Sequence, residues 1–336
     1  MKITDWSIIF VLIAAPLLWI GSLRSEQLRE INRLEIQYTS LLRTAALDGG
    51  MALNLNELQY YESGYASSKF MRTNKELGLE SMLNTLAINF GIQDDPVAKM
   101  AMMRYIPVIL VIDYDGYYLY VMNETTAQDG SIVYEHRWLP KKPFLYEDSH
   151  GNSLSFTLDH YITVIDSFSG AEKRGTAEEI ASGPASNLVA AMPFLQDKNA
   201  FEEVRRSTIV RCIGDDLEAA VRRHNLYTTN QDNNQGNSYV FTLPFMSQED
   251  WNNTIDDIGM LVFLQGLPIG DKYFNNYALG VGRLVKSQPI VGSRNPENGI
   301  KYQSRSGSDF LFPAEEVFSN KSEAAGKGYF EWNERH

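Results

Sequence analysis

The sequence lacks the local signatures of most enzymes and metalloproteins. Its 336 residues include one cysteine, Cys212, which excludes an intramolecular disulfide and is expected to be a buried structural thiol. The five histidines show no HExxH or similar spacing, so a structural zinc site is not expected. There is no G-x-S-x-G elbow, Walker loop or G-x-G-x-x-G fingerprint, and Gly280-Val281-Gly282 is too short to count as one. We therefore expect no enzymatic activity and no bound cofactor.

Basic residues are few relative to acidic ones. The chain has 30 lysines and arginines against 42 aspartates and glutamates, for a formal net charge of -12, and it has no long basic run. A general nucleic-acid surface needs a basic stripe, so no nucleic-acid partner is expected. The hydrophobic content of 44% provides enough apolar material for one large domain or two smaller ones.

One long uncharged run stands near the start of the chain, at residues 6–23. At 1.5 Å per residue it covers roughly 27 Å as a helix, close to the ~30 Å hydrocarbon core of a bilayer. A charged, amphipathic stretch follows it instead of a small-x-small cleavage site and a loop, which favours an uncleaved transmembrane anchor over a cleaved signal peptide. Residues 1–5 would form a short tail. The residues that typify the anchor, with tryptophans near both interfaces, are Trp6, Phe10, Leu12, Pro16 and Trp19.

The amphipathic stretch, residues 24–48, predicts a helical stem continuous with the anchor. Its apolar stripe needs a cover, either the protein's own domain, which is the commoner outcome, or helices of partner subunits. Gly49 and Gly50 are expected to end or loosen the helix, since glycine is a poor helix former. The stripe consists of Leu28, Ile31, Leu34, Tyr38, Leu41, Leu42 and Ala45.

The charges flanking the run leave its sidedness open. Lys2 lies on the short side, whereas Arg24, Arg29, Arg33 and Arg43 lie on the long side. Counted strictly, the positive-inside rule keeps the large domain in the cytoplasm, but long domains translocate largely regardless of charge.

Residues 49–295 predict an α+β domain of helices and antiparallel strands. Capping signals mark several helix starts, and an Asp-Tyr-Asp-Gly turn predicts a hairpin. Residues 228–238 form a polar, asparagine-rich loop. The expected helices are 74–92, 96–103, 177–182, 199 to about 224 and 248–254; the expected strands are the hairpin 108–124, then 131–136, 154–158, 161–165, 239–243 and 259–264.

The same hairpin turn holds the best candidate ligand pair, Asp113 and Asp115. Two carboxylates on alternate residues suit a divalent cation, but the calcium-loop pattern breaks after Gly116, and both are more simply turn formers. A ligand site or catalytic constellation formed only in space would first involve these two residues with His136 and His160.

Three segments resemble a known group of proteins: YIPVILVIDYDGYYLY (105–120), LNTLAINFGIQDDP (83–96) and FLQGLPIGDKYFNNYALGVGRLV (263–285). They look like uncharacterised single-span membrane proteins of Gram-positive bacteria that are associated with Tad-like pilus or type II/IV secretion-like assemblies. The resemblance implies a single-pass cell-membrane protein with its large domain outside the cell. Its partners would be the lipid bilayer and other protein subunits. The resemblance supplies no catalytic residues.

The last part of the chain, residues 296–336, carries a second likeness. FSNKSEAAGKGYFEWN (318–333) resembles the end of small zinc-finger-like modules, yet KYQSRSGSDF (301–310) has no cysteine or histidine at the first ligand positions. A related module would have lost its metal and would rely on packing, and a chance match is the alternative.

The sequence thus favours a non-enzymatic, membrane-anchored subunit or accessory protein of a pilus-like or secretion-like surface assembly. The alternative is an extracytoplasmic sensor-like domain that binds a small molecule.

Overall fold

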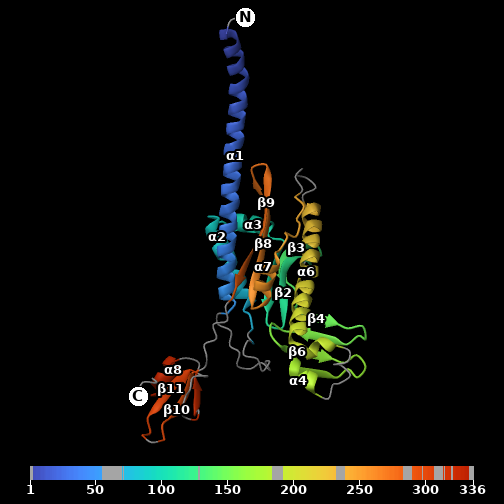
Figure 1. Cartoon of the computed structure of the whole chain (residues 1–336), viewed down its shortest axis with the longest axis vertical. Helices are drawn as coiled ribbons and strands as arrows, with labels where there is room; N and C mark the ends of the chain where they lie inside the picture. The colour runs from blue at the N-terminus through green and yellow to red at the C-terminus, as the bar shows by residue number, and fades with distance from the viewer. Residues whose placement is uncertain are drawn as a thin grey trace. The chain divides into compact units, whose positions relative to one another are not determined.

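The computed structural model describes residues 3–54, 70, 72–127, 129–183, 192–231, 239–282, 290–296, 298–305, 313, 315–318 and 321–332 (Figure 1). The chain divides into two compact units, Met1–Arg283 and Leu284–His336, a division that falls before the boundary expected at residue 295. Helices combine with largely antiparallel sheets, which confirms the predicted α+β class.

The first helix, α1, runs without a break over Ile3–Ala52, so the predicted anchor and stem form one helix (Figure 1). In its N-terminal part Phe10, Leu18 and Trp19 are 72%, 74% and 69% exposed. The side chains of Trp6 and Leu12 lie outside the described residues. Among the residues that the structure describes, no helix is both long and apolar enough to cross a membrane.

A five-stranded sheet forms the centre of the first unit, in the order β3-β2-β1-β8-β9, and every pair in it is antiparallel. The predicted hairpin is confirmed, because β1 and β2 pair across the Asp113-to-Gly116 turn. All six residues of β1 are buried, as expected for a strand with both faces covered. The strands are β1 (Val108–Asp113), β2 (Gly116–Thr126), β3 (Ile132–Trp138), β8 (Gly259–Ile269) and β9 (Lys272–Val281).

The register shows which helices cover each face. Along β9 the even-numbered residues face α1: Asn276 donates to the hydroxyl of Thr39 at 2.9 Å. On the opposite face, the Tyr277 hydroxyl donates to Asp250 of α7 (Gln248–Ile255) at 2.7 Å. On that same face, the Tyr117 hydroxyl of β2 donates to Asp216 of α6 (Lys198–Gln231) at 2.6 Å. The sheet therefore lies between α1 and these two helices, as Figure 1 shows.

Gly49 and Gly50 lie inside α1, so the expectation that they end or loosen the helix is wrong. They allow close packing instead: a Cβ at position 50 would lie 2.5 Å from the carbonyl oxygen of Gly280 on β9. A Cβ at Gly280 would lie only 1.6 Å from the carbonyl oxygen of Ala46. Helix and strand approach at van der Waals distance because neither backbone carries a side chain there.

The other short helices begin where capping chemistry predicts. Asn74 caps α2 (Lys75–Asn89), and Asp95 caps α3 (Pro96–Met103) by accepting from two backbone amides. Thr176 and Glu179 form the predicted capping box of α4 (Ala177–Ser182). Ser247 caps α7.

A second sheet, in the order β4-β5-β6-β7, packs with α4, the 3₁₀ helix η1 (Pro193–Gln196) and the start of α6. Two of its strands, β5 and β6, agree with prediction, whereas β4 and β7 were not predicted. Its strands are β4 (Phe144–Glu147), β5 (Ser153–Phe156), β6 (Tyr161–Ile165) and β7 (Glu172–Thr176).

Two predictions after residue 198 are wrong. Helix α6 continues to Gln231, past the expected end near His224, so the first residues of the predicted polar loop are helical; residues 232–238 lie outside the described residues. Residues 239–243 form no strand. The Asn225 side chain instead satisfies both backbone groups of Phe241, at 2.7 and 2.8 Å, in place of a neighbouring strand.

The second unit is a small module built on one sheet, in the order β12-β10-β11-β13. A glycine at position 292 permits its core, because a Cβ there would lie 2.6 Å from the rings of both Phe318 and Tyr329. Those rings and Ala324 form its buried cluster. The elements are β10 (Ile290–Arg294), β11 (Lys301–Arg305), β12 (Glu316–Phe318), α8 (Lys321–Gly326) and β13 (Phe330–Glu331).

Candidate functional site

The stem residues divide between core and surface. Leu42 and Ala45 are fully buried and Ile31 is nearly so, while Leu28 is about half exposed. The ring of Tyr38 lies 5.4 Å from Phe90 and 5.7 Å from Phe274, centroid to centroid. Leu34 also packs on the core, and Leu41 is half-buried. Most of the predicted partner stripe thus contacts the protein's own domain.

The opposite side of the stem is free of such packing. Ile36 is 72% exposed, and farther along α1 Met51 is 66% exposed. A shallow groove of about 380 Å³ lies on this side, lined by Glu35, Ile36, Thr39, Ser40 and Arg43. The outer face of α1 therefore exposes Ile36 and Glu35 beside Thr39, whose hydroxyl accepts a hydrogen bond from Asn276 of the domain.

Asp113 and Asp115 do come together at the hairpin turn, around one lysine. The Lys141 ammonium donates to Asp113 at 2.7 Å and also to Asp115. Burial raises the pKa of the Asp113 carboxyl, and the nearby lysine opposes that rise. For Lys141, burial disfavours the charge, but the two carboxylates outweigh it and raise its pKa. The lysine occupies the position a cation would take, so the geometry fits an ion pair.

His136 lies elsewhere, beside a second buried histidine. Its Nε2 contacts the carbonyl oxygen of Ile106 at 3.1 Å, and the ring of His224 lies 6.2 Å away. His224 donates through Nε2 to the carbonyl oxygen of Arg104 at 3.0 Å. Burial lowers the pKa of both, to about 4 for His224, so both rings are neutral at pH 7. The two histidine rings therefore hold the segment between α3 and β1 in place through its carbonyl oxygens.

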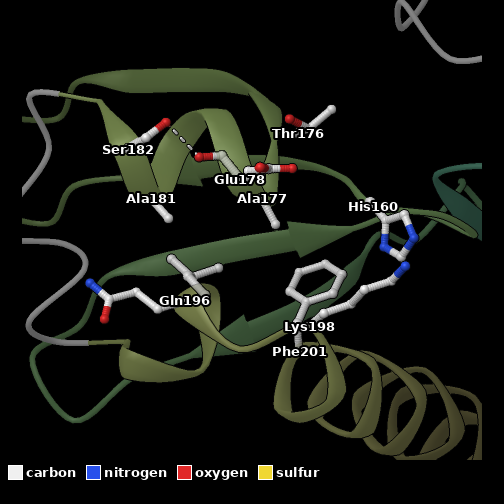
Figure 2. A pocket seen from close by; sticks show the side chains of 10 residues that line it. His160, Thr176, Ala177, Glu178, Ala181, Ser182, Gln196, Lys198 and Phe201 are labelled. Atoms are coloured by element: carbon white, nitrogen blue, oxygen red, sulfur yellow. Dashed lines mark hydrogen bonds between the residues drawn. The ribbon is translucent and has the colours of Figure 1, made fainter.

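Among the predicted candidates, His160 lines a pocket of about 650 Å³ beside the second sheet. Figure 2 shows α4 on one side of it, η1 and the start of α6 on the other, and His160 at one end. Buried Ala177, Leu195 and Phe201 make an apolar floor. The lining residues are His160, Thr176, Ala177, Glu178, Ala181, Ser182, Leu195, Gln196, Lys198 and Phe201.

A chain of charged contacts orients the His160 ring. Its Nδ1 lies 3.1 Å from Oε1 of Glu202, whose Oε2 accepts from the Arg205 guanidinium at 2.7 Å. Burial raises the pKa of Glu202, but the hydrogen bond from Arg205 and the charges of Arg205 and Arg206 together leave the pKa lowered, so the carboxylate is ionised. An ionised acceptor at Nδ1 holds a ring proton there and orients the ring.

The turn that carries His160 is also held firmly. Asp159 accepts hydrogen bonds from the Thr157 hydroxyl at 2.9 Å, the Tyr161 amide at 2.9 Å and the Tyr114 hydroxyl at 2.8 Å. Tyr114 belongs to the turn between β1 and β2, so the central sheet itself fixes the position of His160. A side chain held this way loses little further freedom on binding a ligand.

The structure therefore separates the four candidate residues into three environments. No group of three or more histidine, cysteine, aspartate or glutamate side chains is placed to hold a metal within the described ranges. Sequence reasoning missed Glu202 and Lys198, which start α6 far from His160 in the chain. Near the pocket, the local sequence signal was the capping box of Thr176 and Glu179, which marks the start of α4.

Comparison with known proteins gives no further guide, since no family model, curated protein or solved structure matches this chain.

Proposed function

We propose that this protein is a non-enzymatic, membrane-anchored subunit or accessory protein of a pilus-like or secretion-like surface assembly. The observation that carries the proposal is α1, one helix of 50 residues whose C-terminal half belongs to a folded domain. At 1.5 Å per residue it is about 75 Å long, more than twice the thickness of a hydrocarbon core.

The N-terminal part of this helix needs a cover that the domain does not provide. Phe10, Leu18 and Trp19 are large, apolar and mostly exposed. Exposed apolar side chains within an uncharged run are typical of lipid-facing or subunit-facing segments. A bilayer around residues 6–23 supplies that cover, and helices of other subunits meet the remainder.

The continuity of α1 gives the anchor a mechanical role in this proposal. Because Ala46 and Gly50 pack directly against β9, a shift of the helix along its axis moves the central sheet with it. The outer face around Ile36 and the groove beside it are the surfaces left for partner subunits.

Sidedness is the first test. The full chain with a carboxyl-terminal tag is expressed in Gram-positive cells, the wall is removed, and protease is added to the intact protoplasts. We expect loss of the tag, because the proposal places the large domain outside. A tag protected until lysis, alongside a cleaved external control protein, would place the domain in the cytoplasm and overturn the proposal.

Partner contact is the second test. Ile36→Glu changes an exposed side chain of the stem and should reduce co-purification of partner subunits, whereas Glu26→Gln alters a charge on the same helix and should not. Equal recovery of partners with both variants would remove the outer face from the proposal.

A further inference from the structure

The pocket beside His160 opens to the surface. About 650 Å³ lies over buried Leu195, Ala177 and Phe201, while Glu178, Gln196 and Lys198 around it are exposed. Pockets of this size with an apolar floor and a few polar groups are typical of small-molecule sites.

The polar groups around the floor differ in charge. Lys198, the first residue of α6, supplies an ammonium, and Glu178 on α4 supplies a carboxylate. Because Nδ1 of His160 faces the Glu202 carboxylate, the neutral ring carries its proton on Nδ1 and presents Nε2 as an acceptor. Figure 2 shows Lys198 and Phe201 on the side of α6, with Ala177 and Ala181 on the side of α4.

We propose that this pocket binds a small α-amino or α-hydroxy acid with an apolar side chain. The ligand carboxylate pairs with the Lys198 ammonium, and its ammonium or hydroxyl donates to Nε2 of His160 or to Glu178. The apolar side chain lies against Phe201 and Leu195. The carboxylate and the α-substituent of such a ligand then each have a charged or hydrogen-bonding partner.

This binding is independent of the surface-assembly role, so either can fail alone. The test is isothermal titration calorimetry on the full chain in detergent micelles, with four probes: L-phenylalanine, L-phenyllactate, 3-phenylpropanoate and 2-phenylethylamine. We expect saturable binding of the first two. Loss of the α-substituent or of the carboxylate should each weaken binding about tenfold or more, the equivalent of one charge-assisted hydrogen bond.

Three variants locate the site. Lys198→Met removes the cation, and His160→Asn keeps a donor for Glu202 while deleting Nε2; each should weaken binding of L-phenyllactate about tenfold. Lys272→Met, an exposed lysine at the start of β9, is the matched control and should bind as the unaltered chain does. Thermal unfolding of each variant checks that the fold is retained.

Two results would overturn the proposal. One is the absence of saturable heat from both L-phenylalanine and L-phenyllactate at millimolar concentrations. The other is equal affinity in the folded Lys198→Met and Lys272→Met proteins, since the ligand would then bind elsewhere.

Discussion

The two halves of α1 belong to one continuous helix, yet they face different surroundings. Leu42 is fully buried against the domain, whereas Leu18, in the same helix, is 74% exposed. Leu42 belongs to the amphipathic stripe and Leu18 to the uncharged run, and neither pattern says what covers the side chain. The comparison shows that an amphipathic pattern determines a face, while the neighbour of that face depends on the rest of the chain.

The strongest way to break the packed half is Gly280→Ala. A Cβ there would lie 1.6 Å from the Ala46 carbonyl oxygen, so helix and strand must separate. We expect unfolding to become easier by more than about 4 kcal/mol, in the exceptional range for single changes, as measured by denaturant titration. Gly214→Ala, in open space on α6, is the control and should stabilise by roughly 0.5–1 kcal/mol. Similar effects of the two changes would contradict the close contact.

Truncating a buried and a half-exposed leucine of α1 to alanine sharpens the comparison. Leu42→Ala should cost roughly 3 kcal/mol because it leaves a cavity in the core, and Leu28→Ala should cost less than about 0.5 kcal/mol because that side chain is half exposed. Thermal unfolding of the two variants under one condition measures the difference. Equal losses would mean that residue 28 is buried as deeply as residue 42.

Acid should reduce the stability of the region where α6 packs on the central sheet, and it should leave the packing of α1 unchanged. Burial lowers the pKa of His224 to about 4, from about 6.5 in an unfolded chain. The neutral ring therefore contributes its full stability above pH 6.5 and loses it as pH falls toward 4, by at most about 3 kcal/mol. His136 shifts in the same direction.

Stability measured by urea titration from pH 7 to pH 4 checks this. His224→Gln retains a donor near the Arg104 carbonyl and does not titrate, so its curve should be flatter in that interval. His150→Gln alters an exposed ring and should leave the slope unchanged. A slope as steep in His224→Gln as in the unaltered chain would assign the pH dependence to other groups.

The smallest expected effect lies on the outer half of α1. Trp19→Ala should change the free energy of unfolding of the domain by less than about 0.5 kcal/mol, because the indole is mostly exposed. The same change should weaken retention in the membrane fraction after carbonate washing, where Ser22→Ala serves as the matched control. A clear loss of domain stability in Trp19→Ala would show that this half also packs on the protein.

The sequence indicated the candidate site only in part. His160 was recognisable as a titratable group, but its partner Glu202 and the pocket residue Lys198 lie about forty residues away on another helix. Asp113 and Asp115 were recognisable as a pair, and no local pattern pointed to Lys141 as their cation. Ion pairs between distant segments leave no periodicity, so spacing rules do not find them.

Local rules alone determined much of the secondary structure. The capping box at Thr176 and Glu179, the Asp95 cap and the hairpin at Gly116 follow from backbone chemistry within a few residues, and the structure confirms each. Tertiary structure decided what those rules leave open. It continues α1 through Gly50, and it brings β9 so close to this point that only a residue without a side chain fits. It also gives His160 an orienting carboxylate from α6, because the fold brings together residues that are far apart in the chain.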